Sequence, residues 1–127
     1  KIFKSKNRNL NIIFTLESNL KKIKSLKSKC YKLVTLKEED FNLSNILSNL
    51  AKFGICNLLV EGGSKIFTSF LNEGLVDQLI IFRSNFLIGP QGQEIFSDKL
   101  KLRQNFFVIT NVLNVQNNIM EIFDRKR

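Results

Sequence analysis

The sequence contains no histidine and only two cysteines, and these two shortages exclude several common kinds of site. Without histidine the chain holds neither a Ser-His nor a Cys-His nucleophile arrangement. A zinc site is not expected, because zinc is held mainly by cysteine and histidine side chains. No segment approaches the roughly 20 apolar residues of a membrane span, and no signal peptide is visible. The chain is predicted to carry no metal and to lie outside the membrane.

The two cysteines, Cys30 and Cys56, fall in segments that predict strands. We expect buried free thiols, since cysteine is commonly buried and a reducing cytosol keeps it unpaired. The protein is accordingly expected to be cytoplasmic. A disulfide stays open as the alternative, although nothing in the sequence calls for one. The first residue is Lys1 rather than methionine, which suggests that these 127 residues are a fragment.

Positive charge is concentrated near the amino terminus. Residues 1–32 hold ten Lys or Arg and one acid, Glu17, whereas residues 33–127 hold ten of each sign. A basic block of this kind is one sign of nucleic-acid binding. It lacks the interleaved aromatic residues of a single-strand binder, so we favour a solvated, lysine-rich helix face and expect no nucleic-acid partner. A basic rim can still attract anionic ligands.

Hydrophobic periodicity predicts alternating strands and helices in the first 74 residues. The expected strands are 9–15, 31–36 and 55–60, and the expected helices are 17–27, 43–51 and 64–71. Asp40 or Asn42 can cap the second helix, and Gly54 and Gly74 stand where the second and third helices should end. The β-α-β-α-β-α order is typical of a parallel sheet with crossover helices.

The pattern changes after this point. Residues 78–86 predict a further strand, and residues 88–92, with the sequence Ile-Gly-Pro-Gln-Gly, predict an irregular loop. Residues 106–112 and 119–123 predict two strands joined in an antiparallel hairpin. The sequence therefore predicts one α/β domain over residues 1–127, with a mixed, mostly parallel sheet flanked by helices and a C-terminal antiparallel hairpin.

The most informative stretch is residues 57–67, with the sequence Asn-Leu-Leu-Val-Glu-Gly-Gly-Ser-Lys-Ile-Phe. Its continuous apolar run is typical of a strand covered on both faces. Gly62 and Gly63 allow a sharp turn and a close approach of the backbone to a ligand. Ser64 is expected to cap the helix that follows, whose free N–H groups and positive dipole end suit a phosphate. This arrangement sets Glu61 beside an anion site at a strand's carboxyl end, where open α/β sheets bind ligands.

Three groups of residues, in this order, resemble one known family. They are Leu58-Leu59-Val60-Glu61-Gly62-Gly63-Ser64, then Phe70-Leu71-Asn72-Glu73-Gly74-Leu75-Val76-Asp77-Gln78-Leu79, then Leu87-Ile88-Gly89. They are similar to the C-terminal reductase domain of the bifunctional riboflavin-biosynthesis deaminase/reductase, which has a dihydrofolate-reductase-like fold. The match is good over residues 43–92 and loose on both sides of them.

The resemblance implies an NADPH-dependent oxidoreductase. The implied reaction reduces 5-amino-6-(5-phosphoribosylamino)uracil to 5-amino-6-(5-phosphoribitylamino)uracil. It further implies that Glu61 contacts the substrate and that the turn and first helical turn contact the cofactor. The implied cofactor contacts are Gly62, Gly63, Ser64, Lys65, Ile66 and Phe67, together with Thr15 from a loosely matching strand. No catalytic residue is assigned, and hydride transfer takes its chemistry from the nicotinamide.

The chain also departs from the family pattern. It corresponds to the C-terminal part of a reductase domain and carries no deaminase motif, so activity of these residues alone does not follow from the resemblance. Two alternatives stay open: a reductase of the same fold with another pteridine or pyrimidine substrate, and a non-catalytic nucleic-acid-binding module built on residues 1–32. We also expect a homodimer formed through the late strands.

Overall fold

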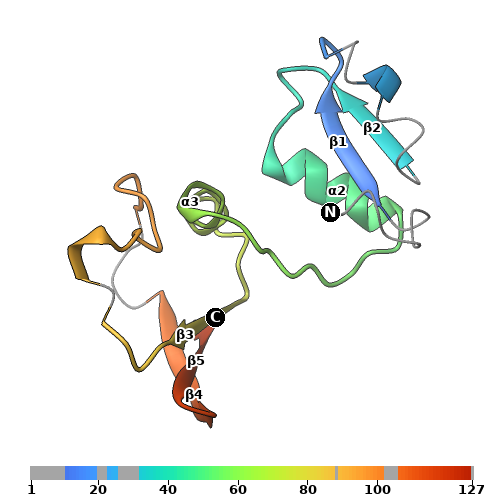
Figure 1. Ribbon diagram of the computed structural model, residues 1–127. Helices are drawn as coiled ribbons and strands as arrows, with labels where there is room; N and C mark the ends of the chain where they lie inside the picture. The colour runs from blue at the N-terminus through green and yellow to red at the C-terminus, as the bar shows by residue number, and fades with distance from the viewer. Residues whose placement is uncertain (1–10, 20–22, 26–31, 88, 102–105, 127) are drawn as a thin grey trace. The chain divides into compact units, whose positions relative to one another are not determined.

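The computed structural model describes residues 11–19, 23–25, 32–87, 89–101 and 106–126 (Figure 1). The chain divides into two compact units, one ending at Leu58 and the other beginning at Leu59, and each is described by itself. Within the described residues, no helix has both the length and the apolar character needed to cross a membrane.

The first unit contains a two-stranded parallel sheet and one long helix. Strands β1 (Ile12–Leu16) and β2 (Lys32–Leu36) pair in parallel, with Ile12 opposite Lys32 and Leu16 opposite Leu36. Parallel strands need a crossover connection, and residues 23–25 of that connection are helical. The remainder of the helix predicted over residues 17–27, and most of the basic block, lie outside the described residues.

Helix α2 (Leu43–Lys52) begins and ends as its sequence predicts. The Asn42 side chain caps it, because Asn42 Oδ1 accepts a hydrogen bond of 2.9 Å from the backbone N–H of Asn45. At the other end Gly54 has a φ of 78°, a left-handed conformation that glycine adopts at little cost. The Gly54 and Ile55 amides bond back to the carbonyls of Ala51 and Leu50, which closes the helix in a Schellman motif.

The strand predicted over residues 55–60 is wrong. These residues form no strand ladder, and Leu58 and Leu59 are 48% and 77% exposed. An apolar run reveals a preference for extended backbone, whereas a strand also needs a neighbour that supplies its hydrogen bonds. Cys56 lies in this segment and is a free, exposed thiol, so the prediction that it is buried is also wrong. Cys30 lies outside the described residues.

The second unit combines one helix with a three-stranded antiparallel sheet. Helix α3 (Ser64–Asn72) precedes β3 (Gln78–Arg83), a short 3-10 helix (Gly89–Gln91) and the hairpin of β4 (Phe107–Val115) and β5 (Asn118–Arg125). The strand order is β3-β5-β4. The predicted hairpin is confirmed. The predicted single, mostly parallel sheet is not confirmed, because the strands of the described residues form two sheets and the larger one is antiparallel.

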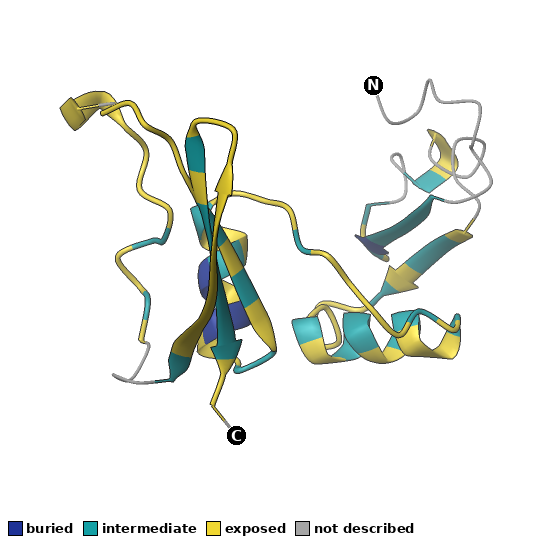
Figure 2. Ribbon diagram, turned by 90° about the horizontal axis from the view of Figure 1, so that it is seen from below, coloured by how far each residue is buried: buried dark blue, intermediate teal, exposed yellow. Residues whose placement is uncertain are grey.

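Helix α3 runs alongside the three-stranded sheet of the second unit (Figures 1 and 2). The buried residues among those described in this unit are all on α3: Thr68, Phe70 and Leu71. Gly74, with a φ of 66°, ends α3 in the same Schellman motif as α2, since Gly74 and Leu75 bond back to carbonyls of the last turn.

Arg125 of β5 makes hydrogen bonds to the segment between α3 and β3. The Arg125 side chain donates a hydrogen bond of 2.6 Å to the Gly74 carbonyl, and its backbone N–H donates one of 2.9 Å to the Asp77 carbonyl. The guanidinium also lies over the ring of Phe106, 5.0 Å from its centroid. These contacts hold the end of α3 and the start of β3 to the hairpin, so the second unit fixes α3 relative to its sheet.

Candidate functional site

The amino terminus of α3 is open. Its N-cap residue is Gly63, which offers no side-chain hydrogen bond, and Ser64 is the first helical residue. The prediction that Ser64 caps the helix is therefore wrong by one position. The reason lies in the turn: the Gly63 carbonyl accepts the first helical bonds, from the Ile66 and Phe67 amides at 3.0 and 3.2 Å.

Four successive backbone amides precede those bonds. Among the described residues, the N–H groups of Gly62, Gly63, Ser64 and Lys65 have no hydrogen-bond acceptor. Orphan donors at a helix start must be satisfied by side chains, water or a ligand. They coincide with the positive end of the helix dipole, which makes this start suited to an anion such as a phosphate.

The two glycines of the turn differ in what surrounds them. A Cβ on Gly62 would approach Ile66 to 3.2 Å, so packing within the chain explains the absence of a side chain there. A Cβ on Gly63 would meet nothing within 4 Å, and the φ of −89° at Gly63 is open to any residue. No contact with a described residue requires glycine at 63. A close approach from outside the chain would require it.

The structure brings most of the predicted site residues together on one segment. Glu61 is exposed ahead of the turn and has no hydrogen bond or ion pair with any described residue. Lys65 and Ile66 are exposed on the first turn of α3, and Phe67 is half-buried. Thr15 belongs to the first unit, where it is 8% exposed on β1 and pairs with Thr35. Its predicted cofactor contact stays a prediction.

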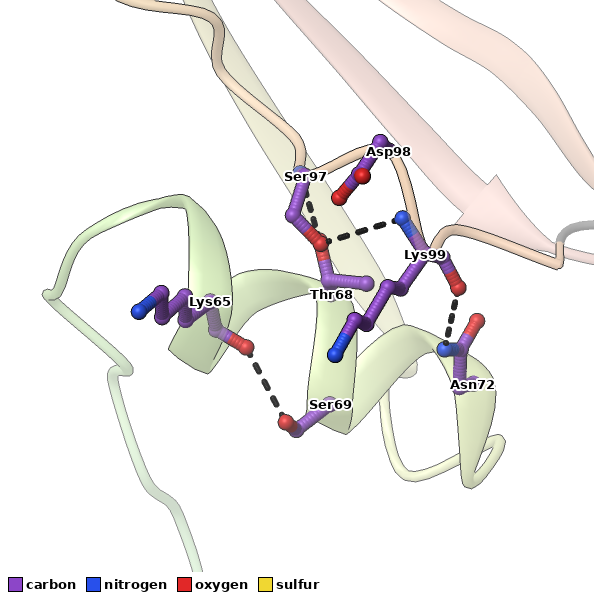
Figure 3. A pocket seen from close by; sticks show the side chains of 7 residues that line it. All are labelled: Lys65, Thr68, Ser69, Asn72, Ser97, Asp98 and Lys99. Carbon is purple, nitrogen blue, oxygen red and sulfur yellow. Dashed lines mark hydrogen bonds between the residues drawn. The ribbon is translucent and has the colours of Figure 1, made fainter.

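A hollow lies along the side of α3 (Figure 3). Its volume is about 340 Å³. Helix α3 contributes Lys65, Thr68, Ser69 and Asn72, and the loop facing it contributes Ser97, Asp98 and Lys99. Lys65 is the only lining residue that belongs to the predicted site, and it connects the hollow with the open helix start.

Sequence reasoning missed the residues that build this hollow. The buried Thr68 accepts a hydrogen bond of 2.9 Å from the Ser97 amide, and Asn72 bonds to the backbone of both Lys99 and Lys101 at 3.0 and 2.8 Å. These contacts span 27 to 29 residues, and no local pattern predicts pairs so far apart. The one available signal was polar residues at helical spacing, Thr68 and Asn72, on the face next to Phe70 and Leu71.

Among the described residues of the second unit, Asp124 has a shifted pKa. The side-chain amide of Gln78 donates a hydrogen bond of 2.9 Å to Asp124. This bond, with a smaller contribution from Thr110, favours the carboxylate and lowers the pKa of Asp124 below its ordinary value. Asp124 lies on the sheet rather than at the start of α3, so this shift belongs to the scaffold.

The second unit is thus a helix on an antiparallel sheet, with a row of unbonded backbone amides before α3. The comparison with known families is more specific: the sequence profile described as the RibD C-terminal domain matches residues 1–121. The chain belongs to this family, as the resemblance seen in its motifs indicated.

Curated relatives agree with this assignment. The chain is 36% identical over 99 residues to the riboflavin biosynthesis protein RibD of Aquifex aeolicus, and 35% identical over 78 residues to that of Bacillus amyloliquefaciens. These matches cover 73% and 61% of the chain, but 27% and 21% of the relatives. The chain thus spans about a quarter of the length of the curated proteins it matches.

Solved structures share the fold. Acinetobacter baumannii RibD matches 95% of the chain and 32% of its own length, with a TM-score of 0.70 at 19% identity. A pyrimidine reductase-like protein from Corynebacterium diphtheriae matches 91% of the chain and 50% of its own length, with a TM-score of 0.76 at 15% identity. At these identities the likeness concerns the fold, and the site has to be argued from the chain's own residues.

Proposed function

We propose that the chain is part of an NADPH-dependent reductase that converts 5-amino-6-(5-phosphoribosylamino)uracil to its ribitylamino counterpart in riboflavin biosynthesis. A Thermotoga maritima protein of the same fold, with a TM-score of 0.63 at 22% identity, is named as a deaminase and as the reductase of this compound. The observation that carries the proposal is the row of unbonded amides from Gly62 to Lys65 directly after Glu61.

The residues present fit a dinucleotide at this corner. Its pyrophosphate would take hydrogen bonds from the open amides, and Gly63 leaves space for that approach. Lys65, Ile66 and Phe67 would line the bound cofactor, with Thr15 as a further contact. A bound NADPH would supply the hydride, and the protein would supply binding and orientation.

Glu61 is the group that we assign to the substrate. Its carboxylate is exposed and has no partner among the described residues. An ionised carboxylate accepts hydrogen bonds from N–H and O–H groups, and the proposed substrate carries both, on its pyrimidine ring and on its ribose. Glu61 would hold the substrate beside the cofactor, which is a positioning contribution to hydride transfer.

The proposal is tested by titrating NADPH into the full-length protein and its Gly63→Val variant. A Cβ at 63 meets no atom of the described residues within 4 Å, so the variant should keep its thermal stability. We expect its NADPH affinity to fall at least about tenfold, because the branched side chain blocks the amides. Asn42→Ala, at the capped start of α2, is the matched control and should leave binding unchanged. Absence of NADPH binding by the unaltered protein would overturn the proposal.

The choice of substrate is tested separately. Turnover would be compared for the phosphoribosylaminouracil and for dihydrofolate, which represents a sister reductase of the same fold. We expect reduction of the first only. Reduction of dihydrofolate alone would keep the reductase class and replace the substrate.

We also propose a cytoplasmic homodimer that uses the late strands. Strands β3 and β4 pair only with β5 among the described residues, so each has an open edge. On one face of this sheet Ile80, Phe82 and Leu113 are 42%, 63% and 41% exposed. Exposed apolar sheet faces and open edges are common places of association. Sedimentation should show a dimer that Phe82→Ser weakens, and a monomer at all concentrations would contradict it.

We propose that nucleic acid is not a partner. The alternative, a module built on the basic block, predicts RNA binding whose affinity falls steeply with salt. Titration of RNA at two salt concentrations separates the two views. Binding with a steep salt dependence, together with no affinity for NADPH, would favour the module.

A further inference from the structure

We propose that the hollow between α3 and residues 97–99 is a subsite for a phosphate monoester, with Lys65, Lys99 and Thr68 as its donors. The proposal rests on the reductase function and adds to it a second phosphate position beside the open helix start. Two reactants carry such a group: NADPH on its adenosine ribose, and the phosphoribosylaminouracil on its ribose.

Hydrogen bonds between α3 and the facing loop hold the walls of the hollow in place. Thr68 is 3% exposed, and its Oγ1 accepts the Ser97 amide at 2.9 Å. The Asn72 side chain makes two hydrogen bonds with the backbone of this loop: it donates to the Lys99 carbonyl and accepts from the Lys101 amide. Three hydrogen bonds therefore hold the loop against α3, and they fix the backbone from which the side chains of Ser97 and Lys99 extend (Figure 3).

The lining has spare donors. Neither Lys65 nor Lys99 has a carboxylate within 4.0 Å among the described residues. The Thr68 and Ser97 oxygens each accept a backbone amide, from Ser97 at 2.9 Å and from Lys99 at 3.4 Å, so each hydroxyl still has its hydrogen to donate. Asp98 is the one acid in the lining. Two ammonium groups against one carboxylate leave a net positive charge, and phosphate oxygens accept charge-assisted hydrogen bonds well.

The position of the hollow agrees with this use. Lys65 belongs both to the open amides and to the hollow. Thr68 is four residues after Ser64, which is about 6 Å along a helix that rises about 1.5 Å per residue. A ligand whose pyrophosphate lies on the amides can therefore place a second phosphate, a few bonds away, between Lys65 and Lys99.

The test measures dissociation constants in the full-length protein for four ligands. NADPH is compared with NADH, which lacks the adenosine phosphate, and the substrate is compared with its dephosphorylated form. The variants are Lys99→Gln and Lys65→Gln. Lys101→Gln is the matched control, since Lys101 is in the same loop but does not line the hollow. Thermal melting checks that each variant is folded.

Two results support the proposal and identify the phosphate. Losing one charge-assisted bond should weaken binding about tenfold. If the cofactor's phosphate is bound, Lys99→Gln weakens NADPH and leaves NADH unchanged. If the substrate's phosphate is bound, Lys99→Gln weakens the phosphorylated substrate and leaves its dephosphorylated form and NADPH unchanged.

Other results overturn it. The subsite is rejected if neither Lys99→Gln nor Lys65→Gln changes the affinity for NADPH or for the phosphorylated substrate. The subsite is equally rejected if NADPH and NADH weaken to the same extent, or if Lys101→Gln acts as strongly as Lys99→Gln. NADPH that binds normally and loses affinity only in Gly63→Val would reject the subsite while keeping the reductase. A protein that binds neither NADPH nor the substrate would reject both.

Discussion

Helices α2 and α3 end alike and start differently. Both close in a Schellman motif on a left-handed glycine, Gly54 or Gly74. At the start of α2 the Asn42 side chain occupies the Asn45 amide. At the start of α3 Gly63 provides no such group, and four amides stay open. The start of α3 therefore leaves more backbone donors for water or a ligand than the start of α2 does.

The acidic residues that precede the two helices also differ in whether they have hydrogen-bond partners. Asp40 precedes α2, and its carbonyl accepts a hydrogen bond of 3.1 Å from the Asn45 side chain. Glu61 precedes α3 and bonds to no described residue. Asp40, near the capped start of α2, is part of the turn, whereas Glu61, near the uncapped start of α3, has its carboxylate available to a ligand. Substitutions that remove or reverse this difference test whether it determines ligand affinity.

Closing the open start should have the largest effect. Gly63→Asp places a carboxylate at an extended N-cap position where a Cβ meets no atom, so it should cap α3 and raise stability by a few tenths of a kcal/mol. The same charge would repel a pyrophosphate, at an energy of about 4 kcal/mol for unit charges 4 Å apart near a protein surface. We expect NADPH affinity to fall about a hundredfold or more, measured by titration.

Gly63→Asn is the control for charge. Asparagine caps a helix about as well as aspartate, so its stability should match that of Gly63→Asp. Its loss of affinity should be smaller, because it adds no negative charge. Equal NADPH affinity in the unaltered protein and Gly63→Asp would show that the α3 start is not an anion site.

Neutralising Glu61 should have the next largest effect. Glu61→Gln removes the charge and keeps the size of the side chain. A hydrogen bond to a charged group contributes about 1.5–3 kcal/mol, so kcat/KM for the phosphoribosylaminouracil should fall roughly 10- to 100-fold. NADPH affinity should change much less. Asp40→Asn, ahead of the closed start, should leave both values unaltered, and an unchanged rate in Glu61→Gln would remove Glu61 from the site.

The helix ends offer the opposite comparison, since there the two helices should respond equally. A left-handed conformation costs a residue with a Cβ about 1–2 kcal/mol. Gly54→Ala and Gly74→Ala should therefore each lower the free energy of unfolding by about that amount, measured by denaturant titration. Neither should alter NADPH affinity beyond the loss of folded protein. A much larger loss in Gly74→Ala than in Gly54→Ala would contradict this expectation, because the new Cβ at 74 would make only an ordinary contact, 3.6 Å, with Arg125 Nη2.

How much of this was predictable follows from which interactions are local. The glycine ends of the helices and the hairpin depend on neighbours within a few residues, and the sequence predicted them correctly. The cap of α2 was narrowed to Asp40 or Asn42, and Asn42 forms it. The Glu61–Phe67 segment could be singled out from the sequence because its motif is contiguous, and its contacts with substrate and cofactor stay predictions. The strand over residues 55–60 and the contacts of Thr68 with Ser97 could not be read in the same way. They depend on which distant segment supplies a partner, and periodicity carries no information about that.

The last and smallest prediction concerns acid. Gln78 and Thr110 lower the pKa of Asp124 by bonding to its carboxylate, so the folded state binds a proton there less readily than the unfolded state. The resulting stability is present above the ordinary pKa of about 3.9 and is lost as the pH falls below it. Asp124→Asn should flatten the pH dependence of the melting temperature below about pH 4, because asparagine has no proton to bind. An equally steep slope in Asp124→Asn would mean that other carboxylates cause it. NADPH affinity at pH 7 should stay the same, since Asp124 belongs to the sheet and the anion site to the start of α3.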